Sequence, residues 1–213
     1  MDLAYIFGTT SIVLYCICYF PQIHVIVKAK SSEGVSVTSI LLWTQADMLS
    51  LVASVLLDLD VILIIINWYN FIIGIVMIII VIKYQRRKSC KASVIISVCV
   101  TAVNIIVCIV VSALRHPDTV AGITIGYFTT ATYILGRFPQ IVENLTRKGT
   151  GEVSVSMYIC TIFANICYII VCFLDPTAIF ENLPWIISTM ACTILDFVIL
   201  FQVWYYPKAS LPN

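Results

Sequence analysis

Two aspartates and one arginine lie deep inside apolar stretches of this chain, where charged side chains are rare. Asp47 and Asp196 stand near the middle of residues 36–57 and 183–206, and Arg137 lies within residues 121–145. A charge in the middle of such a stretch costs about 2.5–3.5 kcal/mol in a bilayer, so it faces a cavity or a partner and marks a functional site by default. Two interpretations stay open: the aspartates bind a cationic ligand, or they form structural pairs with Arg137. We favour the ligand.

Polar side chains accompany these charges at helical spacing. Residues three, four or seven positions apart share one face of a helix, and a polar face inside a membrane points into the bundle. We therefore predict one substrate-binding site, with the candidate residues Trp43, Asp47, Asn70, Tyr133, Arg137, Asn165, Tyr168 and Asp196. For Ser54 and Thr130 we expect hydrogen bonds between packed helices instead.

No arrangement for catalysis accompanies the polar residues. His24 and His116 fall on opposite sides of the predicted membrane, the nine cysteines show no zinc-ligand spacing with histidine, and no nucleotide-binding loop is present. We expect no enzyme activity, no metal and no cofactor. Transport, if that is the function, would be secondary rather than driven by ATP.

The elements that must position these residues are transmembrane helices. The chain has 213 residues, of which 61% are hydrophobic and 11% charged, and soluble domains carry about 25% charged residues. The formal net charge of +1 leaves no basic surface for nucleic acid. Seven apolar stretches have the roughly 20 residues that cross a bilayer: 3–27, 36–57, 61–82, 92–114, 121–145, 154–174 and 183–206. The sequence predicts an all-α membrane protein with seven transmembrane helices and the lipid bilayer as its partner.

Basic residues between the stretches are distributed unequally. Ten of the twelve fall on one side: Lys28, Lys30, Lys83, Arg86, Arg87, Lys88, Lys91, Arg147, Lys148 and Lys208. The other side has Arg115 with Asp2, Asp58, Asp60, Asp118, Asp175 and Glu181. The positive-inside rule then predicts a lumenal or external N-terminus and a cytosolic C-terminus.

An internal repeat organises the seven stretches. Phe20-Pro21-Gln22-Ile23 recurs 118 residues later as Phe138-Pro139-Gln140-Ile141, and Val35-Ser36-Val37 recurs at the same offset as Val153-Ser154-Val155. We expect two three-helix repeats, residues 1–83 and 119–213, with a cytosolic loop and a linker helix in residues 84–118. Because the linker crosses once, the repeats are parallel, in a 3+1+3 arrangement.

The repeated prolines are candidates for hinges. A proline inside a helix removes one backbone hydrogen bond and clashes with the preceding turn. Pro21 and Pro139 could be static kinks, but their recurrence in both repeats favours paired gates. We expect the side chains of Gln22 and Gln140 to bond the loosened backbone.

The repeated Phe-Pro-Gln motif resembles the PQ-loop family, which includes cystinosin, the SWEET carriers and, more distantly, the KDEL receptors. Within that family the chain is most similar to lysosomal and vacuolar exporters of cationic amino acids. The likeness is carried by Gly136-Arg-Phe-Pro-Gln-Ile141, Arg147-Lys-Gly-Thr-Gly-Glu-Val-Ser154, Asn165-Ile-Cys-Tyr168 and Leu195-Asp196.

The resemblance implies a function and a location. It implies a secondary transporter that exports arginine, lysine or histidine from a lysosome or vacuole by alternating access. Protons as a coupling partner stay open, because the residues do not decide between uniport and proton coupling. Two alternatives remain: a sorting receptor of the KDEL-receptor type, and a carrier of another small solute such as cystine or a sugar. A receptor for peptide carboxylates would need several basic side chains in its cavity, and sugars give no reason for two deep aspartates.

Overall fold

The computed structural model describes residues 3–59, 61–85, 91–114, 116–174 and 179–206, and it leaves out several side chains in α5 and at the start of α9. The described helices are α1 (Leu3–Ile17), α2 (Tyr19–Ala29), α3 (Val37–Leu56), α4 (Val61–Tyr84), α5 (Lys91–Leu114), α6 (Thr119–Leu135), α7 (Phe138–Arg147), α8 (Val155–Leu174) and α9 (Ile179–Tyr205). Several residues named above lie outside the described ones: Asp2, Asp60, Arg86, Arg87, Lys88, Arg115, Asp175 and Lys208.

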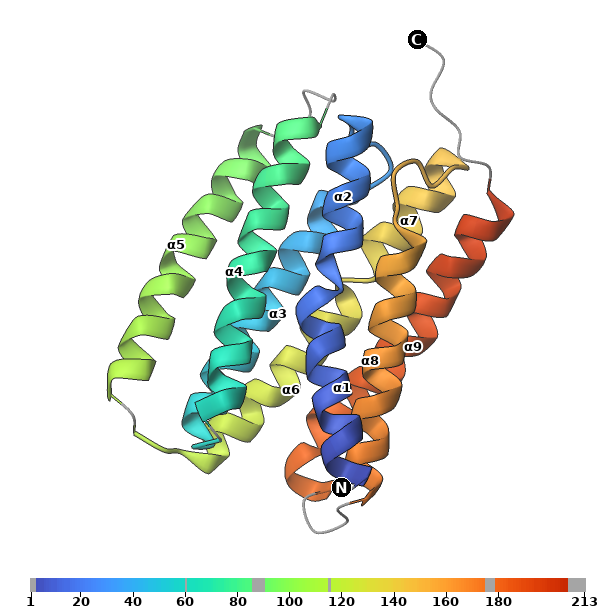
Figure 1. Cartoon of the computed structure of the whole chain (residues 1–213). Coiled ribbons are helices and arrows are strands. Elements are labelled where there is room, and N and C mark those ends of the chain that lie inside the picture. Colours follow the sequence, from blue (N-terminus) through green and yellow to red (C-terminus); the bar gives the residue numbers. More distant parts are fainter. Residues whose placement is uncertain (1–2, 60, 86–90, 115, 175–178, 207–213) are drawn as a thin grey trace.

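These helices form one bundle of seven rods, each of which runs from one end of the bundle to the other and is called a crossing below. α2 continues α1 and α7 continues α6, each after a short break, and the other five helices cross singly (Figure 1). Each crossing agrees with a predicted stretch to within four residues at either end. Five of the crossings among the described residues are long and apolar enough to span a membrane. The prediction of an all-α membrane protein with seven helices is confirmed.

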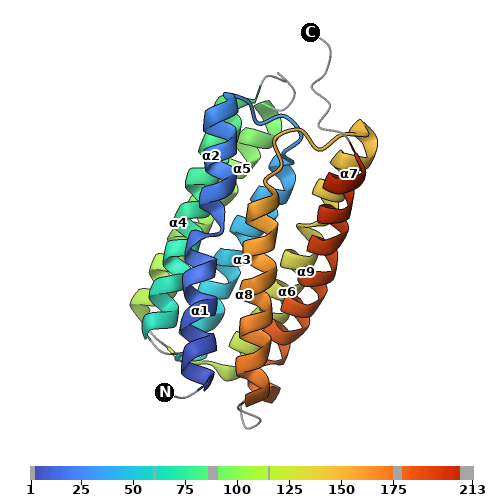
Figure 2. The ribbon, with the colours of Figure 1, turned by 45° about the vertical axis from the view of Figure 1, so that its right-hand side comes forward.

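The bundle consists of two helix triplets that face each other. The first triplet is made of α1 with α2, α3 and α4, and the second of α6 with α7, α8 and α9. In the first triplet α4 packs against both α2 and α3, and in the second α9 packs against α6, α7 and α8. The triplets meet where α1 contacts α8 and where α3 contacts α6, and α5 packs against α3 (Figures 1 and 2). Since α1 and α6 open their triplets and α3 and α8 follow them, the two interfaces are related by a pseudo-two-fold axis.

The two crossings that contain the repeated prolines break at the same place. α1 ends at Ile17, four residues before Pro21, and α6 ends at Leu135, four residues before Pro139. A proline cannot donate to the carbonyl four residues earlier and crowds it, which explains why each helix stops there. Gly136 lies in the second break because a Cβ on it would come within 2.5 Å of Cδ1 of Trp43.

The loops after the prolines define one end of the bundle, which we call the proline–glutamine end. It contains residues 30–36 after α2 and residues 148–154 after α7. Lys30 and Lys148 end their helices in the left-handed conformation, with φ of 51° and 50°. Ser36 and Ser154 then cap the next helices by accepting hydrogen bonds from the backbone N–H of Ser39 and Met157. The repeated residues therefore build repeated turns.

Candidate substrate site

A cavity of about 460 Å³ lies between the two triplets, and this is a size typical of small-molecule sites. Its lining begins at Tyr19 and Met157, passes Asp47 and Asp196, and reaches Gly8, Leu59 and Asn182 at the end away from the proline–glutamine end. All eight candidate residues predicted from the sequence line it: Trp43, Asp47, Asn70, Tyr133, Arg137, Asn165, Tyr168 and Asp196. The structure brings them together, and their role in binding stays a prediction.

Arg137 and Asp196 form a buried ion pair in the wall of this cavity. Nε of Arg137 donates to Oδ1 of Asp196 at 3.3 Å, and Nη1 donates to the backbone carbonyl of Tyr133 at 3.0 Å. The guanidinium carbon lies 5.1 Å from the ring centroid of Trp43, within the range of a cation–π contact. The arginine is thus held from three directions, and its charge is offset by Asp196.

Asp47 is the other buried carboxylate of the cavity and has no cation within ion-pair distance among the described residues. The hydroxyl of Tyr133 donates to its Oδ1, and the hydroxyl of Tyr19 lies beside the same carboxylate, while its Oδ2 accepts no hydrogen bond of normal geometry from the described residues. Among the described residues that line the cavity, Arg137 is the one basic side chain, and it is paired with Asp196. Two aspartates and one arginine carry a formal charge of −1, and the geometry localises that charge on Asp47.

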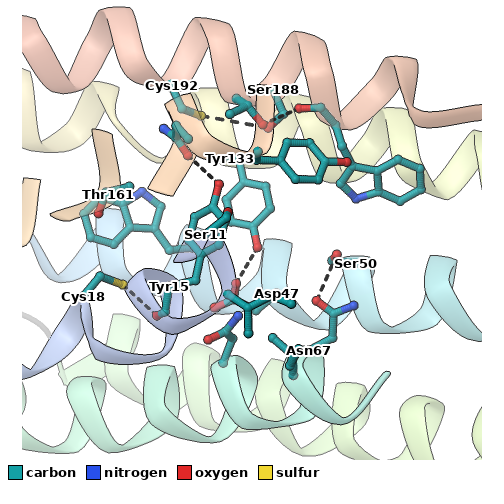
Figure 3. Close-up of a pocket in the computed structure, with 18 of the residues that line it drawn as sticks. Ser11, Tyr15, Cys18, Asp47, Ser50, Asn67, Tyr133, Thr161, Ser188 and Cys192 are labelled. Atoms are coloured by element: carbon teal, nitrogen blue, oxygen red, sulfur yellow. Dashed lines mark hydrogen bonds between the residues drawn. The ribbon is translucent and has the colours of Figure 1, made fainter. Parts of the chain in front are cut away.

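A second tyrosine repeats this arrangement across the pseudo-two-fold axis. The hydroxyl of Tyr15 donates to Oδ1 of Asn165 at 2.6 Å, just as Tyr133 donates to Asp47. Tyr133 follows Tyr15, and Asn165 follows Asp47, by the same 118 residues that separate the prolines. Figure 3 shows Tyr15 and Tyr133 among the residues that line the cavity. Tyr15 was not among the predicted residues, although the repeat offset applied to Tyr133 points to it.

Neutral polar groups complete the wall. Asn67 donates to Ser54 at 2.7 Å, and Ser50 contacts the other end of the Asn67 amide at 3.4 Å (Figure 3). Outside the cavity lining, Thr130 of α6 donates to the carbonyl of Pro184 in α9 at 2.6 Å. The expectation that Ser54 and Thr130 connect packed helices is confirmed. Oδ1 of Asn70 is buried without a partner among the described residues.

The proline–glutamine end is closed by two side chains that each reach into the opposite triplet. Nε2 of Gln22 donates to the carbonyl of Glu152 at 2.7 Å, and its Oε1 accepts from the backbone N–H of Ser154 at 2.7 Å. We call this contact and its counterpart at Gln140 the reciprocal glutamine lock. Gln22 is 1% exposed, so no water competes with these bonds.

Gln140 makes the matching contacts with the first triplet. Its Nε2 donates to the carbonyl of Gly34 at 2.7 Å, and its Oε1 accepts from the backbone N–H of Ser36 at 2.8 Å. We expected both glutamines to bond the loosened backbone at their own prolines. The structure shows that they bond the loop of the other triplet, because the pseudo-two-fold axis brings each loop beside the opposite helix.

The two loops also contact each other directly. The backbone N–H of Glu152 donates to the carbonyl of Glu33 at 2.7 Å, and Arg147 pairs with the carboxylate of Glu33. Gly34 has a φ of 82°, and a Cβ there would lie 2.4 Å from the carbonyl oxygen of Thr150. A side chain at this position would hold the loops apart, so glycine is required for closure.

Gln202 joins α7 to α9 at the same end. Its Oε1 accepts from Asn144 at 2.9 Å, and its Nε2 donates to the carbonyl of Ile141 at 3.2 Å. Oδ1 of Asn144 in turn accepts from Gln140 at 2.9 Å. Asn144 belongs to a glycosylation sequon, but it is fully buried and its amide is bonded on both sides. The lock therefore extends from the loops into α9.

The fold and the cavity define a seven-helix membrane protein made of two three-helix repeats around a central cavity that contains buried charges. The chain belongs to the PQ loop repeat family, whose model matches residues 3–63 and 121–180. It is 27% identical over 99 residues to the lysosomal amino acid transporter 1 homolog of Homo sapiens, covering 43% of this chain and 34% of that protein.

Other relatives agree with this membership. Over 86 residues the chain is 29% identical to the vacuolar lysine transporter YPQ1 of Saccharomyces cerevisiae, which covers 39% of this chain and 28% of that protein. The matches thus span about a third of the length of these relatives. A eukaryotic SWEET transporter has the same fold, with a TM-score of 0.64, 12% identity and coverage of 96% of each chain.

Proposed function

We propose that the chain is a secondary transporter that moves arginine, lysine or histidine out of an acidic organelle, a lysosome or vacuole, by alternating access. The relatives support this substrate class through their names, amino acid transporter and lysine transporter. The observation that carries the proposal is the state of Asp47, a buried cavity carboxylate with no cationic partner among the described residues.

A cationic side chain would complete the charge balance at Asp47. An unpaired carboxylate removed from water is unfavourable, and an ammonium or guanidinium group beside it restores neutrality. The substrate cation also loses hydration, so the net affinity stays modest in a cavity that remains partly hydrated. Modest affinity suits a carrier, because the substrate has to leave on the other side.

The other candidate residues receive roles from their positions around Asp47. Tyr133 fixes the carboxylate that accepts the substrate cation, and Trp43 with Asp196 holds Arg137 in place. Asn165 and Tyr168 line the same cavity and are available to the α-amino and carboxylate groups. Asn70, with its free buried carbonyl oxygen, supplies a further acceptor.

The transport cycle follows from the closed and open ends. The basic residues Lys28, Lys30 and Arg147 lie at the proline–glutamine end, so we assign this end to the cytosol. The conformation described here is then closed toward the cytosol, and its cavity extends toward the lumen. Rocking of residues 1–83 against residues 119–213, with bending at Pro21 and Pro139, would open the cytosolic side.

The rival functions fit the cavity less well. A receptor for peptide carboxylates would need unpaired basic side chains, and the described cavity lining offers Arg137 alone, already paired. The SWEET transporter shares the fold, but a neutral sugar would leave the charge of Asp47 uncompensated.

Uptake into proteoliposomes tests the proposal. Citrulline has the length of arginine without its charge, so wild-type protein should take up labelled arginine, and excess citrulline should compete poorly. Asp47→Asn keeps an acceptor for Tyr133 but removes the charge, and it should lower arginine uptake at least tenfold. The matched control is Asp118→Asn, an exposed cap of α6 where asparagine caps equally well. Uptake of glucose or cystine but not arginine or lysine would contradict the proposal, as would an unaffected Asp47→Asn.

A further inference from the structure

The cavity contains two half-sites that are related by the pseudo-two-fold axis. The charged half-site consists of Tyr133 and Asp47, and the neutral half-site consists of Tyr15 and Asn165, which Thr193 contacts from outside the cavity lining. In both, a tyrosine hydroxyl from the first crossing of one triplet donates to a side chain on the second crossing of the other. The symmetry is broken at one atom: position 47 has a carboxylate oxygen where position 165 has an amide nitrogen.

A directional chain of hydrogen bonds holds the asparagine amide in one orientation. Tyr15 donates to Oδ1 of Asn165, and Nδ2 donates to Oγ1 of Thr193 at 2.9 Å. The hydroxyl of Thr193 donates to the carbonyl of Thr189 at 2.7 Å, so toward Asn165 it can act only as an acceptor. The amide is therefore a fixed donor and acceptor pair and keeps one further position of each kind for a ligand.

This pairing matches the chemistry of a cationic amino acid. Such a molecule has a positively charged side-chain end and an α-carbon end whose ammonium and carboxylate cancel. A carboxylate half-site is complementary to the first end. An amide that both donates and accepts is complementary to the second, because it can bond the carboxylate and the ammonium without adding charge.

We infer that the two half-sites bind the substrate lengthwise, the side-chain cation at Asp47 and the α-carbon end at Asn165, and that the neutrality of Asn165 excludes diamines. Tyr15 is a positioning residue for that end. The inference rests on the proposed function and adds an orientation and a specificity to it. A diamine would place a second cation beside an amide that offers no charge in return.

Agmatine, which is arginine without its carboxylate, tests the specificity. Wild-type protein should bind arginine in preference to agmatine. Asn165→Asp should reverse the preference, with at least a tenfold change in the ratio of the two inhibition constants against labelled arginine. The matched control is Asn67→Asp, which adds the same charge to the same cavity outside both half-sites and should change the ratio less than threefold. An equal shift in Asn67→Asp would overturn the inference, because any added charge would then suffice.

An exchange of the two residues tests the symmetry. Asp47→Asn/Asn165→Asp moves the single charge to the other half-site, so it should regain part of the arginine uptake that Asp47→Asn loses. If Asn165→Asp fails to fold, the apolar variant Asn165→Leu of similar size takes its place. It should bring the inhibition constants of arginine and agmatine close together. Quenching of Trp43 and Trp185, which line the cavity, reports binding apart from turnover.

The outcomes separate the two proposals. Wild-type protein that moves neither arginine nor lysine contradicts the proposed function. A different result overturns only the lengthwise binding. In that case wild-type protein moves arginine and depends on Asp47, but the exchange variant is inactive and the ratio of inhibition constants is unchanged in Asn165→Asp and Asn165→Leu.

Discussion

Arg137 contributes to stability through a charge that lies away from water. It is 7% exposed and Asp196 is fully buried, so removal of either partner leaves the other charge uncompensated. Loss of one member of a buried pair typically destabilises by about 3–5 kcal/mol, whereas an apolar replacement of both is often tolerated. The pair is therefore fragile to single substitution and tolerant of double substitution.

We predict that Arg137→Met markedly lowers the thermal stability of the protein in detergent, and that Arg137→Met/Asp196→Leu recovers most of the loss. Arg147→Met serves as the control, because Arg147 is partly exposed in its pairs with Glu33 and Glu143, and such pairs contribute about 1 kcal/mol or less. A double variant no more stable than Arg137→Met would show that the guanidinium stabilises the fold through Trp43 and Tyr133 instead.

Individual residues of the cavity were predictable to different degrees. Helical spacing and the rarity of buried charge were enough to select eight of the residues that line it. The partner of Arg137 was not predictable, because Asp47 and Asp196 lie at similar depths and the rotation of each helix decides which is in reach. Tyr15 was missed because a single tyrosine among apolar residues has no local pattern.

At the scale of elements, the two breaks at the prolines separate each first crossing into two rods. α1 and α2 meet at Cys18, and α6 and α7 meet at Gly136 and Arg137. A break without the i to i−4 hydrogen bond bends more readily than continuous helix. Because the two breaks lie at the same depth in both triplets, both first crossings could bend in the same movement.

We predict that Pro21→Ala and Pro139→Ala each lower the turnover of arginine several-fold while binding stays detectable by tryptophan fluorescence. Alanine restores the backbone donor and stiffens the crossing. Pro184→Ala is the control, since Pro184 lies inside α9 without interrupting it, and turnover there should stay within twofold of the wild type. Unchanged turnover in both hinge variants would make the breaks static kinks.

The reciprocal glutamine lock makes a second prediction about these elements. Gln22→Ala and Gln140→Ala each leave a buried serine N–H without its partner, at about 1–3 kcal/mol, and each also frees a backbone carbonyl, which is buried at Gly34 and partly buried at Glu152. Either substitution should open the proline–glutamine end. A cysteine in place of Thr150, which is fully buried, should react with a membrane-impermeant thiol reagent faster in both variants than in the parent.

Labelling is compared with the same proteins without Thr150→Cys, because the chain has nine cysteines of its own. Faster labelling in one glutamine variant alone would mean that the two contacts open separately.

The helix spans and the cap serines were predictable because their signals are local. The partners of the glutamines were not, since they lie 130 and 106 residues away along the chain and are brought near only by the packing of the triplets.

For the whole molecule, the odd number of crossings places the start of α1 and the end of α9 on opposite faces of the bundle (Figure 2). The excess of basic residues at the proline–glutamine end predicts which face is cytosolic. Cysteines introduced near the N-terminus should react with an impermeant reagent only from the lumenal side, and those near the C-terminus only from the cytosolic side. Reaction of both from one side would contradict the topology.

Each half of the chain holds the other half's loop, and this reciprocity is that of an isologous contact between two identical subunits. A substitution at Gln22 removes the acceptor of the Ser154 N–H, and one at Gln140 removes the acceptor of the Ser36 N–H. The two halves can therefore diverge freely at Asp47 and Asn165, where they serve different ends of a ligand, but not at the lock. We expect sequences of relatives to show this contrast: the glutamine of one half covarying with the loop of the other, and the cavity residues of the two halves drifting apart.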